Sequence, residues 1–172
     1  MTTTLNQLTG DYVLDAARTR IGFVARHRMA TRVRGRFDAF EGAVHLDGDD
    51  PARSSAQLTI RADSIETGDR RRDAQLRKDF LDAVTHPIIT FISTEVSQVG
   101  SSAFEVTGDL TIRGITHPVA VPFELVSTPV GDIAFAAALT IERARWQVNW
   151  NALTTALVSP TVFLDLQVFV AA

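Results

Sequence analysis

Apolar and polar residues alternate over long stretches of this chain, and this alternation constrains the fold more than any other feature of the sequence. Between residues 104 and 112 the apolar or small residues are Phe104, Val106, Gly108, Leu110 and Ile112, and the residues between them are polar. A period of two places the two sets of side chains on opposite faces of an extended strand. The segment is therefore predicted to be a β-strand with one buried and one solvated face.

Eight segments carry this pattern or a less regular form of it. They lie near residues 21–27, 33–46, 56–62, 88–96, 104–112, 119–125, 133–141 and 161–170. Short turns with glycine, proline or aspartate separate them, as in an antiparallel meander. Eight strands, several of them about ten residues long, favour an up-and-down β-barrel over a sandwich. Eight is also about the smallest number of strands that can enclose a ligand.

One segment has a helical pattern instead. Between Asp69 and Asp82, apolar residues such as Leu76 and Phe80 recur at helical spacing, and Asp69 suits the first turn of a helix. We expect a short helix that ends before Pro87 and flanks one end or side of the barrel. The predicted class is therefore all-β, an antiparallel eight-stranded barrel with one short helical segment.

The length and composition indicate a single domain. The chain has 172 residues, of which 45% are hydrophobic and none is cysteine, so it can bury a sizeable core without disulfides. The longest apolar run, residues 133–139, is far shorter than the roughly 18 residues of a membrane-spanning helix. The N-terminus lacks the pattern of a secretory signal, which predicts a cytoplasmic location. We expect residues 1–9 to form an N-terminal extension and residues 10–172 a single barrel domain.

The sequence contains no familiar motif of catalysis, metal binding or nucleic-acid recognition. It has no nucleophile elbow, phosphate-binding loop, dinucleotide fingerprint or histidine pair with metal-ligand spacing. The acidic run 47–50 is interpreted as a hairpin turn rather than a calcium loop, because the glutamate that closes a calcium loop is missing. The net charge is −3. We therefore expect no metal, no cofactor other than a bound lipid, and no nucleic-acid partner.

Several short motifs occur in the order and spacing of a known family. They are Tyr12-Val-Leu-Asp15, Gly35-Arg-Phe37, Phe40-Glu-Gly42, Ser64-Ile-Glu-Thr-Gly68, Arg72-Asp73, Asp79-Phe80-Leu81-Asp82, His86-Pro87-Ile-Ile-Thr-Phe91 and Gly108-Asp-Leu-Thr-Ile-Arg-Gly114. Together they resemble the YceI-like family from about residue 10 to residue 170. The resemblance implies a lipocalin-like, extended barrel that encloses a polyisoprenoid, a quinone or another lipid. It also implies a role in transport or storage, and a homodimer.

The strand pattern and the resemblance together define candidate residues for the barrel lumen. They are Phe23, His27, Phe37, Phe91, Phe104, Val106, Phe123, Phe135, Leu139 and Trp146. The alternative is that the aromatic side chains fill a solid core. Glycine and alanine residues on the strands favour a lumen, because they leave space that side chains do not fill.

Polar residues near the helix are candidates for binding a ligand head group. They are Arg70, Arg72 and Asp73, since arginine can bind a phosphate through two parallel hydrogen bonds. For Arg72 and Asp73 we favour a structural alternative, an internal ion pair that docks the helix. His27 has two interpretations as well, a buried histidine with satisfied hydrogen bonds or a contact to a head group.

The leading functional hypothesis is a non-catalytic carrier that holds a long lipophilic molecule in the lumen. A second hypothesis is an enzyme acting on an amphiphile, with His27 as acid or base near Asp73. A third is a barrel with a packed interior that serves as an interaction module. A cavity would favour the first two hypotheses, and an apolar outer patch without a cavity would favour the third.

Overall fold

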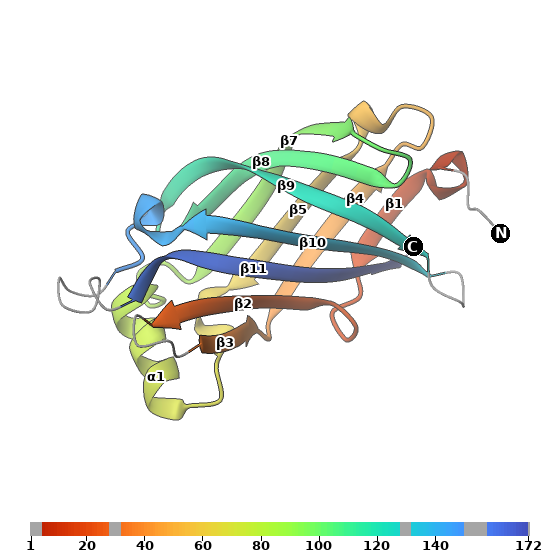
Figure 1. Cartoon of the computed structure of the whole chain (residues 1–172). Coiled ribbons are helices and arrows are strands. Elements are labelled where there is room, and N and C mark those ends of the chain that lie inside the picture. Colours follow the sequence, from red (N-terminus) through yellow and green to blue (C-terminus); the bar gives the residue numbers. More distant parts are fainter. Residues whose placement is uncertain (1–4, 28–31, 128–131, 150–157, 172) are drawn as a thin grey trace.

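The computed structural model describes residues 5–27, 32–127, 132–149 and 158–171. Most of these residues lie in antiparallel strands (Figure 1). The strands are β1 (Gly10–Leu14), β2 (Arg20–His27), β3 (Arg32–Phe37), β4 (Phe40–Leu46), β5 (Ser55–Arg61), β6 (Ile65–Glu66), β7 (Ile88–Gln98), β8 (Ala103–Ile112), β9 (Ile115–Ser127), β10 (Ile133–Glu142) and β11 (Val158–Ala171). The helical segments are η1 (Leu5–Leu8), η2 (Pro51–Arg53), η3 (Ala62–Ser64), α1 (Arg70–Gln75), η4 (Leu76–Phe80) and η5 (Arg143–Trp146).

The strands form one sheet that closes into a barrel. Its hydrogen-bonded order is β1-β4-β5-β7-β8-β9-β10-β11, and β11 pairs again with β1 through Val13↔Ala171 and Leu14↔Val170. The remaining strands extend this ring at one end: β2 pairs with β11, β3 with β2, and β6 with β3. The predicted eight-stranded antiparallel barrel is confirmed, and strands that are neighbours in the barrel follow one another along the chain.

Three of the eight barrel strands are interrupted. β1 and β2 are two halves of one strand along β11, β3 and β4 are halves of the next, and β5 and β6 are halves of the third. At the first interruption, the Asp15 carboxylate accepts hydrogen bonds from the Ala17 backbone N–H and from Arg18 Nε. The Thr19 hydroxyl then bonds the backbone of Phe169 on β11. Side chains thus replace part of the ladder where the strand bends.

The pairing between β9 and β10 ends early because β9 contains two prolines. The N–H of Leu125 donates to Ser102 on the β8 side, so the even-numbered N–H groups of β9 face β10. Pro118 and Pro122 occupy two of these positions and have no N–H to donate. The paired register accordingly stops at Ala137↔Phe123. Beyond this point β10 stays paired with β11 as far as Glu142, and the chain then enters η5, which contacts β9.

The predicted helix is confirmed as α1 followed by the π-turn η4, at one end of the barrel (Figure 1). The Asp69 side chain caps α1 by accepting hydrogen bonds from the backbone N–H groups of Arg71 and Arg72, at 3.0 and 3.2 Å. Arg77 donates from Nε to the carbonyl of Asp63, 2.8 Å away, which ties η4 to the turn between β5 and β6.

Two glycines on the barrel wall lie beneath phenylalanine rings. A Cβ added at Gly35 would lie 2.3 Å from Cζ of Phe23, and one added at Gly108 would lie 2.5 Å from Cζ of Phe91. The sequence analysis expected these glycines to leave open space in the lumen, and the structure shows instead that phenylalanine rings cover them. They let the rings of the neighbouring strands lie close against the wall.

The hydrophobic core is concentrated at the α1 end of the barrel. Its buried members are Ile21, Ile60, Ala62, Ile65, Leu81, Ala83, Ile89, Ile112 and Trp146. Toward the other end, inward-facing residues such as Phe104, Phe123 and Phe135 are only half-buried. Side chains on the inner face of a filled barrel would be fully covered. The barrel is therefore packed most tightly near α1, and its interior is not completely filled along its axis.

Candidate functional site

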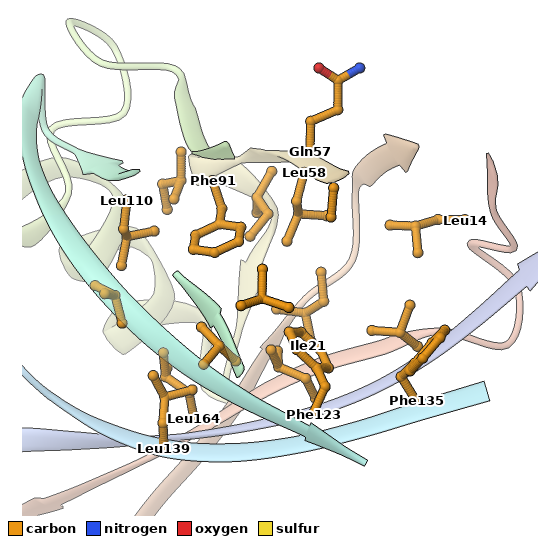
Figure 2. Close-up of a pocket in the computed structure, with 18 of the residues that line it drawn as sticks. Leu14, Ile21, Gln57, Leu58, Phe91, Leu110, Phe123, Phe135, Leu139 and Leu164 are labelled. Atoms are coloured by element: carbon orange, nitrogen blue, oxygen red, sulfur yellow. The ribbon is translucent and has the colours of Figure 1, made fainter. Parts of the chain in front are cut away.

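A cavity of about 340 Å³ lies inside the barrel. It extends from Leu76, Phe80 and Val148 near α1 to Leu46, Gly48 and Pro51 at the turn between β4 and β5. In Figure 2, Phe91, Leu110 and Leu164 are among the side chains that surround this space. Its volume lies within the range of small-molecule sites, and its shape follows the barrel axis, which suits an elongated ligand.

The cavity wall is apolar because inward positions alternate with outward ones on every strand. On β5, the side chain of Leu58 points toward the cavity and that of Gln57 points away from it (Figure 2). Two aromatic rings of the wall contact each other: Phe123 and Phe135 meet edge to face, with their ring centroids 6.4 Å apart. Such pairs are more favourable than their buried area alone suggests.

Eight of the ten lumen candidates line the cavity. They are Phe23, Phe37, Phe91, Phe104, Val106, Phe123, Phe135 and Leu139. The side chain of His27 lies outside the described part of the structure. Trp146 lies elsewhere, in the core cluster: it is fully buried, its Nε1 donates to the carbonyl of Leu110 at 2.9 Å, and its indole meets the ring of His117 edge to face.

The three head-group candidates near the helix lie outside the cavity lining. Asp73 is 5% exposed and accepts hydrogen bonds from the backbone N–H and the hydroxyl of Thr67. Arg72 donates from Nε to the same hydroxyl, at 2.7 Å. Thr67 therefore stands between the two residues that the sequence suggested as a direct ion pair. Arg70 is exposed on the first turn of α1.

Arg143 is a cavity residue that the sequence analysis missed. It follows Leu139 and Ile141 at the same spacing of two residues along and just beyond β10. This alternation could have identified Arg143 as an inward-facing residue from the sequence. It is 5% exposed and lines the cavity at the η5 end. Burial lowers the pKa of its guanidinium through desolvation. A guanidinium keeps its charge when it is buried, so Arg143 brings a charged group to this end of an otherwise apolar wall.

The polar residues at the other end of the cavity belong to the turn between β4 and β5. The Asp47 carboxylate accepts hydrogen bonds from the backbone N–H groups of Asp49 and Asp50, and the Asp47 N–H donates to the Ser54 hydroxyl. This pattern confirms the hairpin-turn interpretation of the acidic run. Leu8 also lines the cavity, and its carbonyl accepts a hydrogen bond from the Tyr12 hydroxyl. Part of the predicted N-terminal extension thus contributes to the wall.

Among the residues that the structure describes, no three histidine, aspartate or glutamate side chains lie close enough together to hold a metal ion. None of the described helices is both long and apolar enough to cross a bilayer.

Comparison with known proteins connects this cavity to a family. The profile of the YceI-like domain matches residues 12–170. The chain belongs to the YceI-like family. A UPF0312 protein of Pseudomonas aeruginosa is 35% identical over 122 residues, which are 69% of this chain and 63% of the relative. A UPF0312 protein of Vibrio parahaemolyticus is 34% identical over 125 residues, 71% of this chain and 66% of the relative. The matched region thus spans less than two thirds of these relatives.

Solved structures share the barrel. The crystal structure of Burkholderia cenocepacia BcnA superimposes with a TM-score of 0.85 at 30% identity, over 92% of this chain and 99% of BcnA. A polyisoprenoid-binding domain from Saccharophagus degradans superimposes with a TM-score of 0.77 at 22% identity, over 94% of this chain and 98% of that domain. The YceI-like fold therefore extends over nearly the whole chain.

Proposed function

We propose that this protein is a non-catalytic binding protein that holds a polyisoprenoid or a similar long lipophilic molecule inside its barrel. The elongated apolar cavity is the observation that carries this proposal. The similar fold of the polyisoprenoid-binding domain from Saccharophagus degradans supports it. Because the ligand would be surrounded by strands, its chain would be shielded from water while the protein carries or stores it.

Burial of the ligand chain supplies the binding free energy. Each CH₂ group removed from water contributes about 0.8 kcal/mol, so a five-carbon isoprene unit contributes roughly 3–4 kcal/mol before ordering costs. A few units inside the cavity would be enough for tight binding. The polar contacts would then set the orientation of the ligand and the choice of head group.

The two competing hypotheses have less support. The enzyme hypothesis places His27 and Asp73 together as an acid–base pair, but Asp73 is engaged by Thr67 and does not line the cavity. The hypothesis of a packed barrel requires a filled interior, and the cavity argues against it. The homodimer and the cytoplasmic location expected from the sequence stay predictions.

Binding of a polyprenol to two matched variants tests the proposal. Phe135→Asp places a carboxylate in the cavity wall beside Phe123, whereas Glu105→Lys changes a charge on the exposed face of β8. An unpaired charge next to an apolar chain should weaken polyprenol binding about tenfold or more, and Glu105→Lys should leave it unchanged. Equal effects of the two substitutions would show that the ligand does not occupy the lumen.

Unfolding curves recorded for both variants show whether each one folds. If Phe135→Asp does not fold, Leu139→Asp makes the same change four residues further along β10, on the same inner face. Polyprenol binding that survives in a folded Leu139→Asp variant would contradict the proposal in the same way.

A further inference from the structure

The outer face of β2 and β3, which lie side by side below the barrel ring in Figure 1, is rich in arginine. The two strands contain no acidic residue, although the whole chain has a net charge of −3. Their exposed arginines are Arg20, Arg26, Arg32, Arg34 and Arg36. These positions alternate with cavity-lining residues such as Phe23 and Phe37, so the arginines share the outer face. This face is therefore cationic on a protein that is negative overall.

Three neighbouring arginines of this face have no acidic partner in the part of the chain that the structure describes. Arg26, Arg32 and Arg34 are absent from the ion pairs between described residues, whereas Arg36 pairs with Asp38 at 2.7 Å. Arg26 and Arg32 lie directly opposite each other across β2 and β3. Like charges in such a position destabilise a sheet, and an anionic partner would relieve their repulsion.

Charges on an edge strand also have a purely structural explanation. β3 pairs with β6 only at Arg36 and Phe37, so the backbone of residues 32–35 forms an edge of the sheet. Charged side chains on such an edge discourage pairing with other chains. This explanation does not account for Arg26, because β2 lies between β11 and β3 and is not an edge strand.

Apolar side chains lie beside the three arginines on the same face. Arg34 is opposite Val24 on β2, and Val24 is opposite Phe163 on β11. Phe163 is 42% exposed, which is unusual for a large aromatic residue in a sheet. A row of arginine, valine and phenylalanine across three strands thus combines positive charge with exposed apolar area. Segments that bind at membrane surfaces combine the same two features.

We propose that this arginine surface, formed by Arg26, Arg32, Arg34, Val24 and Phe163, docks the protein on a bilayer that contains anionic lipids. The guanidinium groups would donate hydrogen bonds to lipid phosphates, and Phe163 would enter the boundary between head groups and acyl chains. Duplex DNA would satisfy the arginines but would leave Val24 and Phe163 without an apolar partner. The inference rests on the proposed function in its choice of partner, because a long lipophilic ligand resides in bilayers.

Sedimentation with lipid vesicles tests the docking surface. The protein is mixed with vesicles of phosphatidylcholine alone, or of equal parts phosphatidylcholine and phosphatidylglycerol, at low and at high salt. The test variant is Arg32→Gln/Arg34→Gln. The matched control is Arg53→Gln/Arg61→Gln, which removes the same charge from exposed arginines on η2 and β5.

We expect the wild-type protein to bind the vesicles that contain phosphatidylglycerol at least about tenfold more tightly than phosphatidylcholine vesicles, and salt should release it. Each arginine near an anionic bilayer strengthens binding about fivefold, so Arg32→Gln/Arg34→Gln should weaken it about tenfold or more. Arg53→Gln/Arg61→Gln should weaken it by less than about threefold, because these residues lie outside the docking surface. Phe163→Ser should weaken binding without changing its dependence on salt.

Three results would overturn the docking surface. The first is equal binding of the wild-type protein to both kinds of vesicle. The second is an equal loss of binding in the two double variants. The third is binding to duplex DNA but not to vesicles, with loss of DNA binding in Arg32→Gln/Arg34→Gln, which would assign the arginines to a nucleic acid instead.

Binding of a polyprenol in solution separates failure of the docking surface from failure of the proposed function. The vesicles contain no polyprenol, so docking is measured independently of the cavity. Arg32 and Arg34 do not line the cavity, so their double variant should bind polyprenol like the wild-type protein, which also shows that it folds. A wild-type protein that binds polyprenol but not the anionic vesicles would refute the docking surface alone. One that binds the vesicles but no polyprenol would refute the proposed function and leave the docking surface standing.

Discussion

Replacing Gly108 with alanine would place a methyl group where the ring of Phe91 lies against the barrel wall. The new Cβ would lie 2.5 Å from Cζ of Phe91 and 2.7 Å from the carbonyl oxygen of Ile92. Favourable contacts between heavy atoms lie near 3.5–4.0 Å, so both contacts are too close. The Phe91 ring can turn away, but the Ile92 carbonyl belongs to the backbone of β7. The two strands must therefore shift apart locally.

The cost follows from two opposing effects. Overpacking of a core costs about 1–3 kcal/mol. Loss of backbone freedom in the unfolded chain offsets about 0.4–1 kcal/mol of that cost. The net effect should be a destabilisation of about 1–2 kcal/mol, which in a domain of this size lowers the melting temperature by roughly 2–8 °C. Urea unfolding and thermal unfolding followed by circular dichroism measure both quantities.

Gly22→Ala is the matched control for this prediction. Gly22 is also a buried glycine on a strand, but a Cβ there would meet no atom closer than 3.4 Å. This substitution should leave the stability unchanged or raise it by up to about 1 kcal/mol. If Gly108→Ala were as stable as Gly22→Ala, the close approach of Phe91 to the β8 backbone would be refuted.

Two further substitutions test contacts outside the cavity. Thr67→Val removes the hydroxyl that donates to Asp73 and accepts from Arg72, and it should lower the free energy of unfolding by about 1–3 kcal/mol. Thr116→Val, which removes an exposed hydroxyl on β9, should have little effect, and similar urea midpoints for the two variants would contradict the role of Thr67. Asp15→Asn tests pH dependence: the hydrogen bond from Arg18 lowers the pKa of Asp15, so the stabilisation is present above the ordinary pKa of an aspartate and is lost as the pH falls through the lowered pKa. The melting temperature of Asp15→Asn should be below that of the wild-type protein at neutral pH and equal to it in acid, and a constant difference at all pH values would contradict this explanation.

The strand pattern was enough to predict the barrel because inward and outward positions alternate regularly over long segments. Phe104, Val106 and Leu110 were assigned to the inner face by parity alone, and the structure places all three on the cavity wall. The start of the helix near Asp69 could also be predicted from the sequence, because the capping interaction involves only the next few residues.

The interruptions of the first three strands could not be predicted in the same way. The bend between β1 and β2 depends on the hydrogen bonds between Thr19 and the backbone of Phe169, which is 150 residues away in the sequence. A periodic pattern contains no information on such a partner. The glycines were misread for a related reason, since the ring that covers Gly108 comes from another strand.

The turn after β10 explains why Trp146 and Arg143 were misjudged. Its aromatic character made Trp146 a lumen candidate, but the period of the chain changes from two to three where β10 passes into η5. The indole is thereby carried into the core cluster beside His117. Arg143, at the last position that keeps the strand parity, faces the cavity instead. The inward register of this charged residue was therefore a signal that its side chain reaches the cavity.

Native mass spectrometry of freshly purified protein tests the central claim most directly. The claim is that the cavity holds a long lipophilic chain, so the protein should carry a bound adduct, or take one up after incubation with polyprenols, polyprenyl phosphates or quinones. Solvent extraction should then release a compound whose mass series steps by isoprene units or that contains another long apolar chain. A bare protein mass that stays unchanged after incubation with all of these compounds would contradict the claim.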